Sequence, residues 1–191
     1  MSVARVDFDD QLAPTLFKRG SVALGPLLPQ DSALMYLWLN DIETTGMDIP
    51  YRPTDGNSLS TWLNTFSADP SRVLFAIRLA GRADTAGFLL LSGINSTNRS
   101  AELGIRIGRE VDRSRGTGTA AVALGLGYAW DHLNLVRVQL RVMASNLRAI
   151  SAYLSAGFAI EGQHRNAAFI AGRWHDMLTM AALNPREAPS S

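Results

Sequence analysis

The chain has 191 residues, with 18 basic and 17 acidic side chains, a formal net charge of +1 and no cysteine. This length suits one domain that buries a sizeable hydrophobic core. The balanced charge argues against general binding to nucleic-acid phosphates, and the lack of cysteine excludes disulfides, thiolate metal sites and a cysteine nucleophile.

Metal and membrane binding are also disfavoured. The three histidines, His132, His164 and His175, lack ligand spacing to carboxylates, so we expect no metal site. The longest uncharged run, residues 116–130, is too short and too rich in glycine to span a bilayer. Residues 1–20 carry acidic and basic side chains, unlike a secretory signal. We therefore expect a soluble cytoplasmic protein with neither nucleic-acid nor membrane partners.

The chain begins without a clear hydrophobic pattern. Residues 1–20 show no period, and we expect them to form a loose N-terminal arm. Residues 21–27 predict a first strand, which prolines end. Asp31 or Ser32 is then expected to cap a helix, because the apolar residues of 32–43 recur at helical spacing.

A loop, a short helix and three strands are expected next. Residues 44–58 contain glycine and two prolines, which predicts a loop. Ser58 or Ser60 is expected to open a second short helix that ends before Pro70. Apolar runs separated by turn residues then predict an antiparallel meander over residues 72–80, 85–94 and 101–108.

The C-terminal half alternates between helices and strands. The predicted helices cover residues 117–132 and 146–157, and the predicted strands cover 136–144, 158–165 and 173–183. This order predicts a mixed α/β sheet rather than a helical bundle or a β-sandwich. We expect a single domain over residues 21–183 and a flexible tail over 184–191.

The turn before the long helix has the features of an anion site. A strand that enters a helix through glycine exposes backbone N–H groups at the positive end of the helix dipole. Gly116 and Gly118 allow a tight bend and a close approach, and Arg113 and Arg115 add positive charge there. The alternative is a plain turn before a core helix.

A dinucleotide fold is one candidate for this turn, and its spacing does not fit. Gly116, Gly118 and Ala121 satisfy the G-x-G-x-x-A pattern. In dinucleotide folds, however, the glycines follow the strand directly, and an acidic residue about twenty positions later holds the ribose. Here REVDRSR intervenes, and the next strand ends without an acid.

A second family fits better. The segment RSRGTGTA resembles the R/Q-x-x-G-x-G/A signature of the GNAT N-acetyltransferases, with Arg113, Gly116 and Gly118 in place. Residues 146–158 are similar to the family's Asn-x-x-(Ser/Ala)-x-x-x-Tyr-x-x-x-Gly-Phe motif. GRWHDMLTMAAL resembles the closing strand of the branch that includes the ribosomal-protein (RimJ/RimL-type) acetyltransferases. The resemblance implies a GNAT-like domain with about six or seven mostly antiparallel strands, splayed at the centre, and about four flanking helices.

The resemblance also implies where acetyl-coenzyme A binds. The pantetheine arm is expected to pair like an added strand with the backbone of Ile105 and Ile107. Arg113 and Arg115 are expected to lie along the diphosphate. Asn146 resembles the residue that contacts the arm, although it could equally be only the N-cap of its helix. The diphosphate is expected to meet the amides of Arg115, Gly116, Thr117, Gly118 and Thr119.

The resemblance places a general acid at Tyr153, on the same helix as Asn146. A phenol there could donate a proton to the departing sulfur; the alternative is a tyrosine buried on the apolar face of its helix. Because the chain has no cysteine, we expect direct attack by the amine in a ternary complex.

The sequence offers two candidates for the base. Glu102 begins the strand that lines the cleft and is our candidate, acting through a water molecule. It could instead be an ordinary carboxylate paired with Arg106 or Arg99. His175 is an alternative base, or else a surface histidine.

The first two helices and their loop are expected to contact the acceptor amine. Asp48 and Asp55 could receive a cation, although this stretch lacks the dense acidic lining expected for a polyamine. The composition therefore favours a peptide N-terminus or an amino sugar, and the family resemblance is compatible with a homodimer. A catalytically idle domain that binds acyl-coenzyme A is the alternative function. The candidate acceptor contacts are Trp38, Tyr51, Arg52 and His175.

Overall fold

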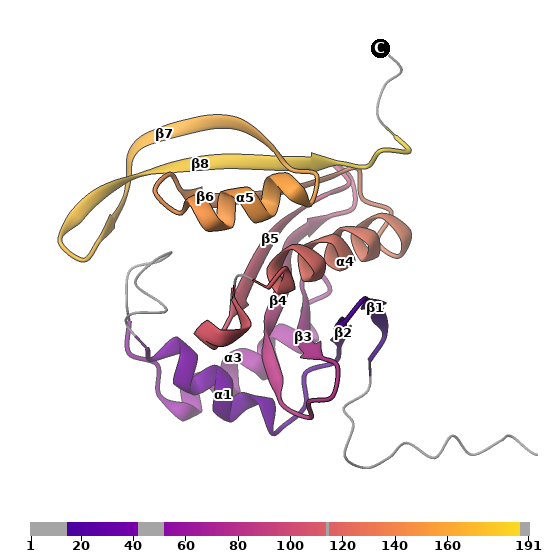
Figure 1. Ribbon diagram of the computed structural model, residues 1–191, viewed down its shortest axis with the longest axis vertical. Coiled ribbons are helices and arrows are strands. Elements are labelled where there is room, and N and C mark those ends of the chain that lie inside the picture. Colours follow the sequence, from indigo (N-terminus) through magenta and orange to yellow (C-terminus); the bar gives the residue numbers. More distant parts are fainter. Residues whose placement is uncertain (1–14, 42–51, 114, 188–191) are drawn as a thin grey trace, which may run out of the picture.

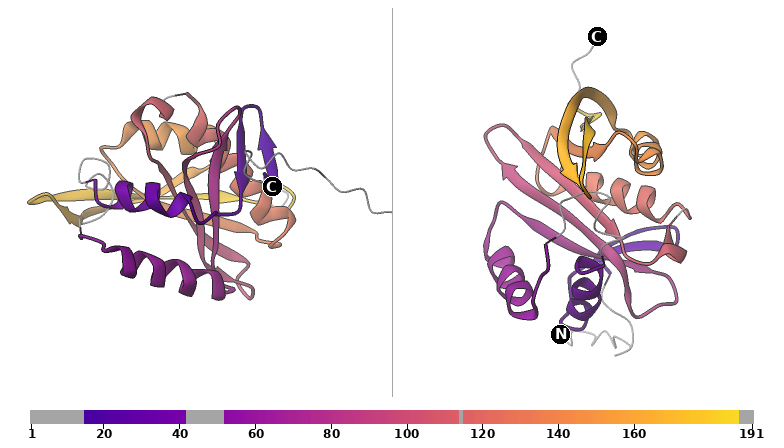
Figure 2. Two further views of the ribbon diagram at one scale, coloured as in Figure 1. Left: turned by 90° about the horizontal axis from the view of Figure 1, so that it is seen from below. Right: turned by 90° about the vertical axis from the view of Figure 1, so that its left-hand side faces the viewer.

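The structure, a computed structural model, describes residues 15–41, 52–113 and 115–187. Its centre is an eight-stranded sheet with strand order β1-β2-β3-β4-β5-β6-β8-β7. Helices α1 and α3 cover one face of this sheet, and α4 and α5 cover the other (Figures 1 and 2). The predicted α/β class is confirmed, with eight strands instead of six or seven.

The strands and helices have the following bounds. The strands are β1 (Phe17–Arg19), β2 (Val22–Gly25), β3 (Val73–Leu79), β4 (Thr85–Asn95), β5 (Ser100–Ile107), β6 (Arg137–Met143), β7 (Ala159–Ile170) and β8 (Arg173–Leu183). The helices are α1 (Asp31–Leu39), α3 (Gly56–Ala68), α4 (Thr117–Asp131) and α5 (Leu147–Ser155), with a single 3-10 turn, η1, at Glu110–Asp112.

The expected splay lies between β5 and β6. These strands are parallel, whereas the other neighbours in the sheet pair antiparallel. Their register pairs run only from Ser100↔Arg137 to Glu102↔Gln139. On its other edge, β5 stays paired with β4 as far as Ile107. The sheet is therefore continuous at one end and open at the other.

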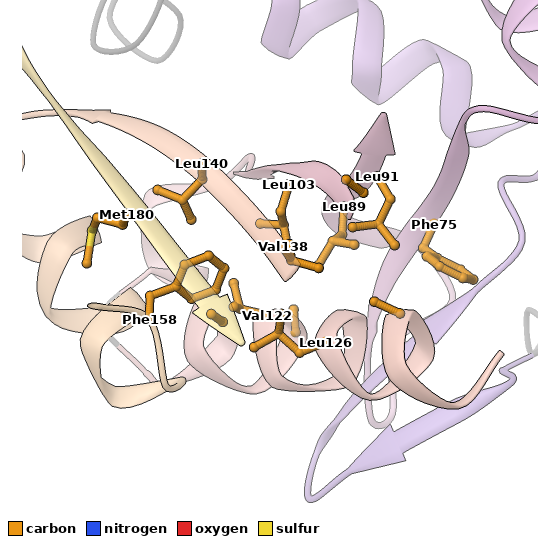
Figure 3. Close-up of a cluster of buried hydrophobic side chains, with 14 of the residues drawn as sticks. Phe75, Leu89, Leu91, Leu103, Val122, Leu126, Val138, Leu140, Phe158 and Met180 are labelled. Carbon is orange, nitrogen blue, oxygen red and sulfur yellow. The ribbon is translucent and has the colours of Figure 1, made fainter. Parts of the chain in front are cut away.

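The main core lies between the sheet and α4. Leucines and valines of the sheet and of α4 pack together there with Phe75, Phe158 and Met180 (Figure 3). Gly125 of α4 sits so close to the sheet that a Cβ would lie 2.9 Å from a methyl group of Leu89. Close packing of helix on sheet thus accounts for a glycine that costs about 1 kcal/mol of helix propensity.

Both expected terminal segments contribute more to the domain than predicted. Within the expected N-terminal arm, residues 17–19 form β1, and the Phe17 ring packs edge-on against Phe75 and Tyr128. In the expected tail, Asn184 is buried and donates its side-chain amide to the carbonyl of Leu135. The ring contacts of Phe17 and the hydrogen bond of Asn184 join residues far apart in sequence, so no local sequence pattern could predict them.

The starts of α1 and α3 differ from the prediction. Gln30, not Asp31 or Ser32, precedes the first turn of α1. The helix α3 begins at Gly56, earlier than Ser58 or Ser60, because the Asp55 carboxylate accepts hydrogen bonds from two backbone N–H groups of its first turn.

Asp31 instead forms a buried ion pair. Its two oxygens accept from the Arg78 guanidinium at 2.7 and 2.5 Å, and one also accepts from the backbone N–H of Leu28. The side chains of Asp31 and Arg78 are 2% and 3% exposed. This pair ties the first turn of α1 to strand β3.

In the part of the chain that the structure describes, no helix is long and apolar enough to cross a membrane.

We predict that Asp31→Asn lowers the free energy of unfolding by about 3–5 kcal/mol, because it leaves a buried guanidinium without its counter-charge. Urea denaturation followed by circular dichroism measures this change. Glu161→Gln is the matched control, since it breaks the exposed pair between Glu161 and Arg137 and should cost at most about 1 kcal/mol. Equal losses in the two variants would contradict the assignment.

Candidate active site

The gap between β5 and β6 opens into a cavity of about 300 Å³. Its walls come from the end of β5, the first turns of α4, and α5. These elements are far apart in sequence and meet only where the sheet splays. The cavity is lined by Ile105, Arg106, Ile107, Arg113, Gly116, Gly118, Thr119, Val122, Asn146, Arg148, Ala149, Ser151, Ala152, Tyr153 and Ser155.

The open edge of β5 forms one wall of the cavity. Ile105 and Ile107 line the cavity, and they pair on the other side with Leu89 and Gly87 of β4. The register pairs with β6 have already ended at Glu102. The strand thus presents a backbone edge that an extended ligand can join by strand addition.

The glycine turn forms a second wall, at the start of α4. Gly116 precedes the helix with φ +76°, a left-handed conformation that favours glycine. Within the described residues no side chain caps this helix, and its own backbone bonding starts with the bond from the Ala120 N–H to the Gly116 carbonyl. The first-turn N–H groups, with Gly118 and Thr119 lining the cavity, therefore suit an anion.

Three other residues that were predicted to belong to the cradle, Arg113, Arg115 and Thr117, have different surroundings from one another. Arg113 lines the cavity, but its guanidinium turns back to donate to the carbonyls of Ile107 at 3.1 Å and Gly108 at 2.9 Å. Arg115 is exposed, Thr117 is buried, and neither side chain lines the cavity. Arg113 thus contacts the end of β5, and the expected position of Arg113 and Arg115 along the diphosphate stays a prediction.

The helix α5 brings Asn146 and Tyr153 to the third wall. Asn146 is the N-cap of α5, since its side-chain oxygen accepts from the Ala149 N–H at 3.1 Å, and it also lines the cavity. The N-cap role is thus confirmed, and the contact of Asn146 with the coenzyme arm stays a prediction. Tyr153 is half-buried, packs its ring 5.8 Å from that of Phe158 and lines the cavity as well.

Comparison with known proteins agrees with this geometry. Residues 22–159 match the family described as the acetyltransferase (GNAT) domain. The chain belongs to the GNAT acetyltransferase family.

Several GNAT relatives act on amines. The spermidine N(1)-acetyltransferase of Escherichia coli is 33% identical over 112 residues, which span 59% of this chain and 59% of that relative. The Bacillus subtilis protein YdaF, named as a candidate ribosomal N-acetyltransferase, is 26% identical over 84% of each chain. A crystal structure of the Vibrio cholerae spermidine N-acetyltransferase with CoA and spermine superposes with a TM-score of 0.79 and 26% identity, covering 86% of this chain and 96% of that one.

These comparisons confirm the predicted GNAT domain. The predicted enzyme class and coenzyme agree with this family and with the CoA held by the Vibrio structure. The relatives include both spermidine and candidate ribosomal acetyltransferases. The assignment to the ribosomal-protein branch and the expected homodimer therefore stay predictions.

Sequence reasoning missed four polar residues of the GNAT cavity, Arg106 on β5 and three on α5. Arg148, Ser151 and Ser155 are exposed and line it from α5. Their spacing of three and four positions puts them on one helix face, the face that begins next to Asn146. This spacing was the available signal. It was overlooked because an exposed polar helix face usually faces only water.

Glu102 does not line the cavity. It is exposed and lies in register with Ser92 of β4 and Gln139 of β6. Its expected partners are engaged elsewhere, since Arg99 pairs with Glu187 and Arg106 donates to the carbonyl of Trp38. Among the residues that the structure describes, the Glu102 side chain has no partner. The carboxylate is thus available at the last register pair before the splay.

Two expected acceptor contacts serve the fold instead. Trp38 is 7% exposed and packs on Gly108, where an added Cβ would lie 1.9 Å from its ring. The Nε2 of His175 lies 3.3 Å from the carbonyl of Ile170, within the hairpin of β7 and β8. Neither residue lines the cavity. In the structure, Trp38 packs against the end of β5 and His175 belongs to the hairpin of β7 and β8.

Of the other acceptor candidates, Arg52 is exposed and outside the cavity lining, and Tyr51 and Asp48 lie outside the described residues.

Two carboxylates near the predicted acceptor side are held by hydrogen bonds. Asp55 caps α3, and the hydrogen bonds from the Ser58 side chain and from backbone N–H groups lower the pKa of its carboxyl group. The backbone N–H of Asn166 and the amide of Gln163 likewise lower the pKa of Asp176. Both carboxylates are therefore ionised at neutral pH, and both are engaged by neighbouring groups.

We predict that Gly118→Glu weakens coenzyme A binding on the order of 100-fold, because a carboxylate at the cradle repels the diphosphate. Isothermal titration calorimetry with coenzyme A measures the dissociation constant. Gly127→Glu makes the same change later in α4, at another glycine where a Cβ would meet nothing within 4 Å, and should bind normally. Equal binding by both variants would argue against the cradle.

Proposed function

We propose that the protein transfers the acetyl group of acetyl-coenzyme A to a primary amine by direct attack in a ternary complex. One observation carries this proposal. In the part of the chain that the structure describes, a single cavity joins the open edge of β5, a helix N-terminus without a side-chain cap and a tyrosine, which can serve the coenzyme arm, its diphosphate and the departing sulfur. The family of acetyltransferases and the relatives that act on amines support it.

The coenzyme half of the site is built mainly from backbone. The first-turn amides of α4 can hold the diphosphate, and the open edge of β5 can pair with the extended arm. Arg148, which is exposed on the cavity wall, adds a cation for a phosphate group. When bound, acetyl-coenzyme A supplies an activated thioester. The protein must orient this thioester, remove a proton from the ammonium of the acceptor and give a proton to the departing sulfur.

Tyr153 is proposed as the proton donor to the departing sulfur. Its position inside the cavity and its packing against Phe158 would hold the phenol in a fixed orientation. Glu102 remains the proposed base for the ammonium. Since it lies outside the cavity lining, its proton transfer would run through water.

For the acceptor we propose a small primary amine, with spermidine as the first candidate. The support comes from the relatives, which include spermidine acetyltransferases. The charges of the described residues give a polycationic acceptor less support than the relatives do. The carboxylates of Asp55 and Asp176 already accept hydrogen bonds from neighbouring groups. A peptide N-terminus and an amino sugar, which the composition favoured, are therefore included in the test.

The acceptor is tested by following the release of free thiol from acetyl-coenzyme A with a panel of amines. The panel contains spermidine, spermine, glucosamine and a short peptide that begins with alanine. We predict turnover, with the highest kcat/KM for spermidine. If the protein binds coenzyme A but none of the amines in the panel causes release of thiol, the idle binding domain becomes the better description.

We predict that Tyr153→Phe lowers kcat by about 10²-fold, since the thiolate must then leave without a general acid. The KM for acetyl-coenzyme A should change little, because the ring and its packing remain. Steady-state thiol release with the best amine measures both constants. Tyr128→Phe, which removes a hydroxyl from a half-buried ring stacked on the exposed His132, outside the cavity lining, is the control and should keep kcat. An unchanged kcat in Tyr153→Phe would remove the tyrosine from the chemistry.

A further inference from the structure

An ion cluster lies directly before the glycine turn. It consists of Arg82 and Asp84 from the turn between β3 and β4, together with Arg109 and Asp112 from the segment that follows β5. The Arg82 guanidinium binds Asp112 at 2.7 Å and Asp84 at 2.9 Å, and Arg109 binds Asp84 at 2.6 Å. We call these four residues the linker clamp, because they join the turn before β4 to the segment after β5, beyond the last register pair of these strands at Gly87 and Ile107.

Asp112 is the buried member of the linker clamp. Its side chain is 5% exposed, whereas those of Arg82 and Asp84 are 26% and 34% exposed. One carboxylate oxygen accepts from Arg82, and the other is buried without a hydrogen-bond partner among the described residues. A buried carboxylate with a single cationic partner depends strongly on that partner. Arg82 therefore holds Asp112 in place.

Two members of the linker clamp, Arg82 and Asp84, have pKa values shifted toward their charged forms. Arg82 lies between two carboxylates, and its hydrogen bonds to Asp84 and then to Asp112 raise the pKa of its guanidinium. The hydrogen bond from Arg82 also lowers the pKa of the Asp84 carboxyl group. Both effects favour the ionised forms that hold the clamp together.

The segment held by the linker clamp leads into the coenzyme cradle. Between the end of β5 at Ile107 and the start of α4 at Thr117, its only regular structure in the described residues is the single turn η1. Arg113 fixes this segment from the inner side, through the carbonyls of Ile107 and Gly108. The pair of Arg82 and Asp112 fixes it from the turn between β3 and β4. Gly116, which starts the cradle, follows Asp112 closely in sequence.

We infer that Arg82 and Asp112 are positioning residues for coenzyme binding: they hold the linker so that the first-turn amides of α4 are in place before the ligand arrives. The inference rests on the proposed use of this turn as a diphosphate cradle. Neither side chain lines the cavity, so both act through the backbone of the linker. Preorganised donors bind more tightly because little order remains to be imposed on binding.

The test compares Asp112→Asn and Arg82→Gln with the wild-type protein. Calorimetry with coenzyme A gives the dissociation constant, and thiol release gives kcat and the KM values for acetyl-coenzyme A and for the amine. We expect the dissociation constant and the KM for acetyl-coenzyme A to rise about tenfold, which is the effect of one lost hydrogen bond between charged groups. We expect kcat and the KM for the amine to stay within about twofold.

Glu187→Gln is the matched control, because it breaks the ion pair of Arg99 with Glu187 and leaves the linker untouched. Its coenzyme binding should equal that of the wild type. If Arg82→Gln fails to fold because it leaves the Asp112 carboxylate buried without its cation, Asp112→Asn decides the question, since Arg82 then keeps its pair with Asp84. The melting temperature reports whether each variant is folded.

The two proposals fail in distinguishable ways. If the wild-type protein binds no coenzyme A, the proposed function fails, and this inference fails with it. If the wild type binds coenzyme A, while folded Asp112→Asn and Arg82→Gln bind it as tightly, the inference is overturned and the proposed function stands. A uniform loss of kcat with unchanged coenzyme binding would also overturn it.

Discussion

The site depends on the early end of pairing between two parallel strands. β5 is paired with β4 along one edge, but on its other edge the register with β6 ends at Glu102. The backbone groups of β5 beyond that point need partners, because unpaired backbone groups carry a free-energy cost when they are shielded from water. An extended ligand arm can supply those partners. The gap between the strands is therefore both a weakness of the sheet and the source of its binding capacity.

Keeping such a gap open requires that both sides be held elsewhere. On one side, α4 packs tightly on the sheet at Gly125, and the end of β5 is fixed by Arg113 and by the ring of Trp38 on Gly108. On the other side, β6 is fully paired with β8, and α5 packs against α4. Several residues that looked like candidate ligand contacts in the sequence thus hold the frame around the cavity.

The two halves of the site are built from different materials. In the proposed site, the coenzyme half would use backbone amides, a strand edge and small residues, an arrangement that tolerates wide variation in side chains and suits a ligand shared by many proteins. The acceptor half must use side chains, because an amine is distinguished by its charge and shape. This division explains why the coenzyme can be inferred from general features of the fold, while the acceptor is proposed from relatives and tested with a panel.

The sequence by itself determined the features that are local in the chain. The glycine turn, the spacing of Asn146 and Tyr153 on one helix, and the alternation of helices and strands each follow from the conformational preferences of neighbouring residues. Tertiary structure alone decided the pairing of Asp31 with Arg78 and of Arg82 with Asp112, the packing of Phe17 on Phe75 and Tyr128, and the cavity face of α5. These depend on contacts between residues far apart in sequence, where burial and charge compensation outweigh local preference. The sequence does not show whether a charged side chain faces water or forms a buried ion pair, because the fold determines which residues are brought next to it.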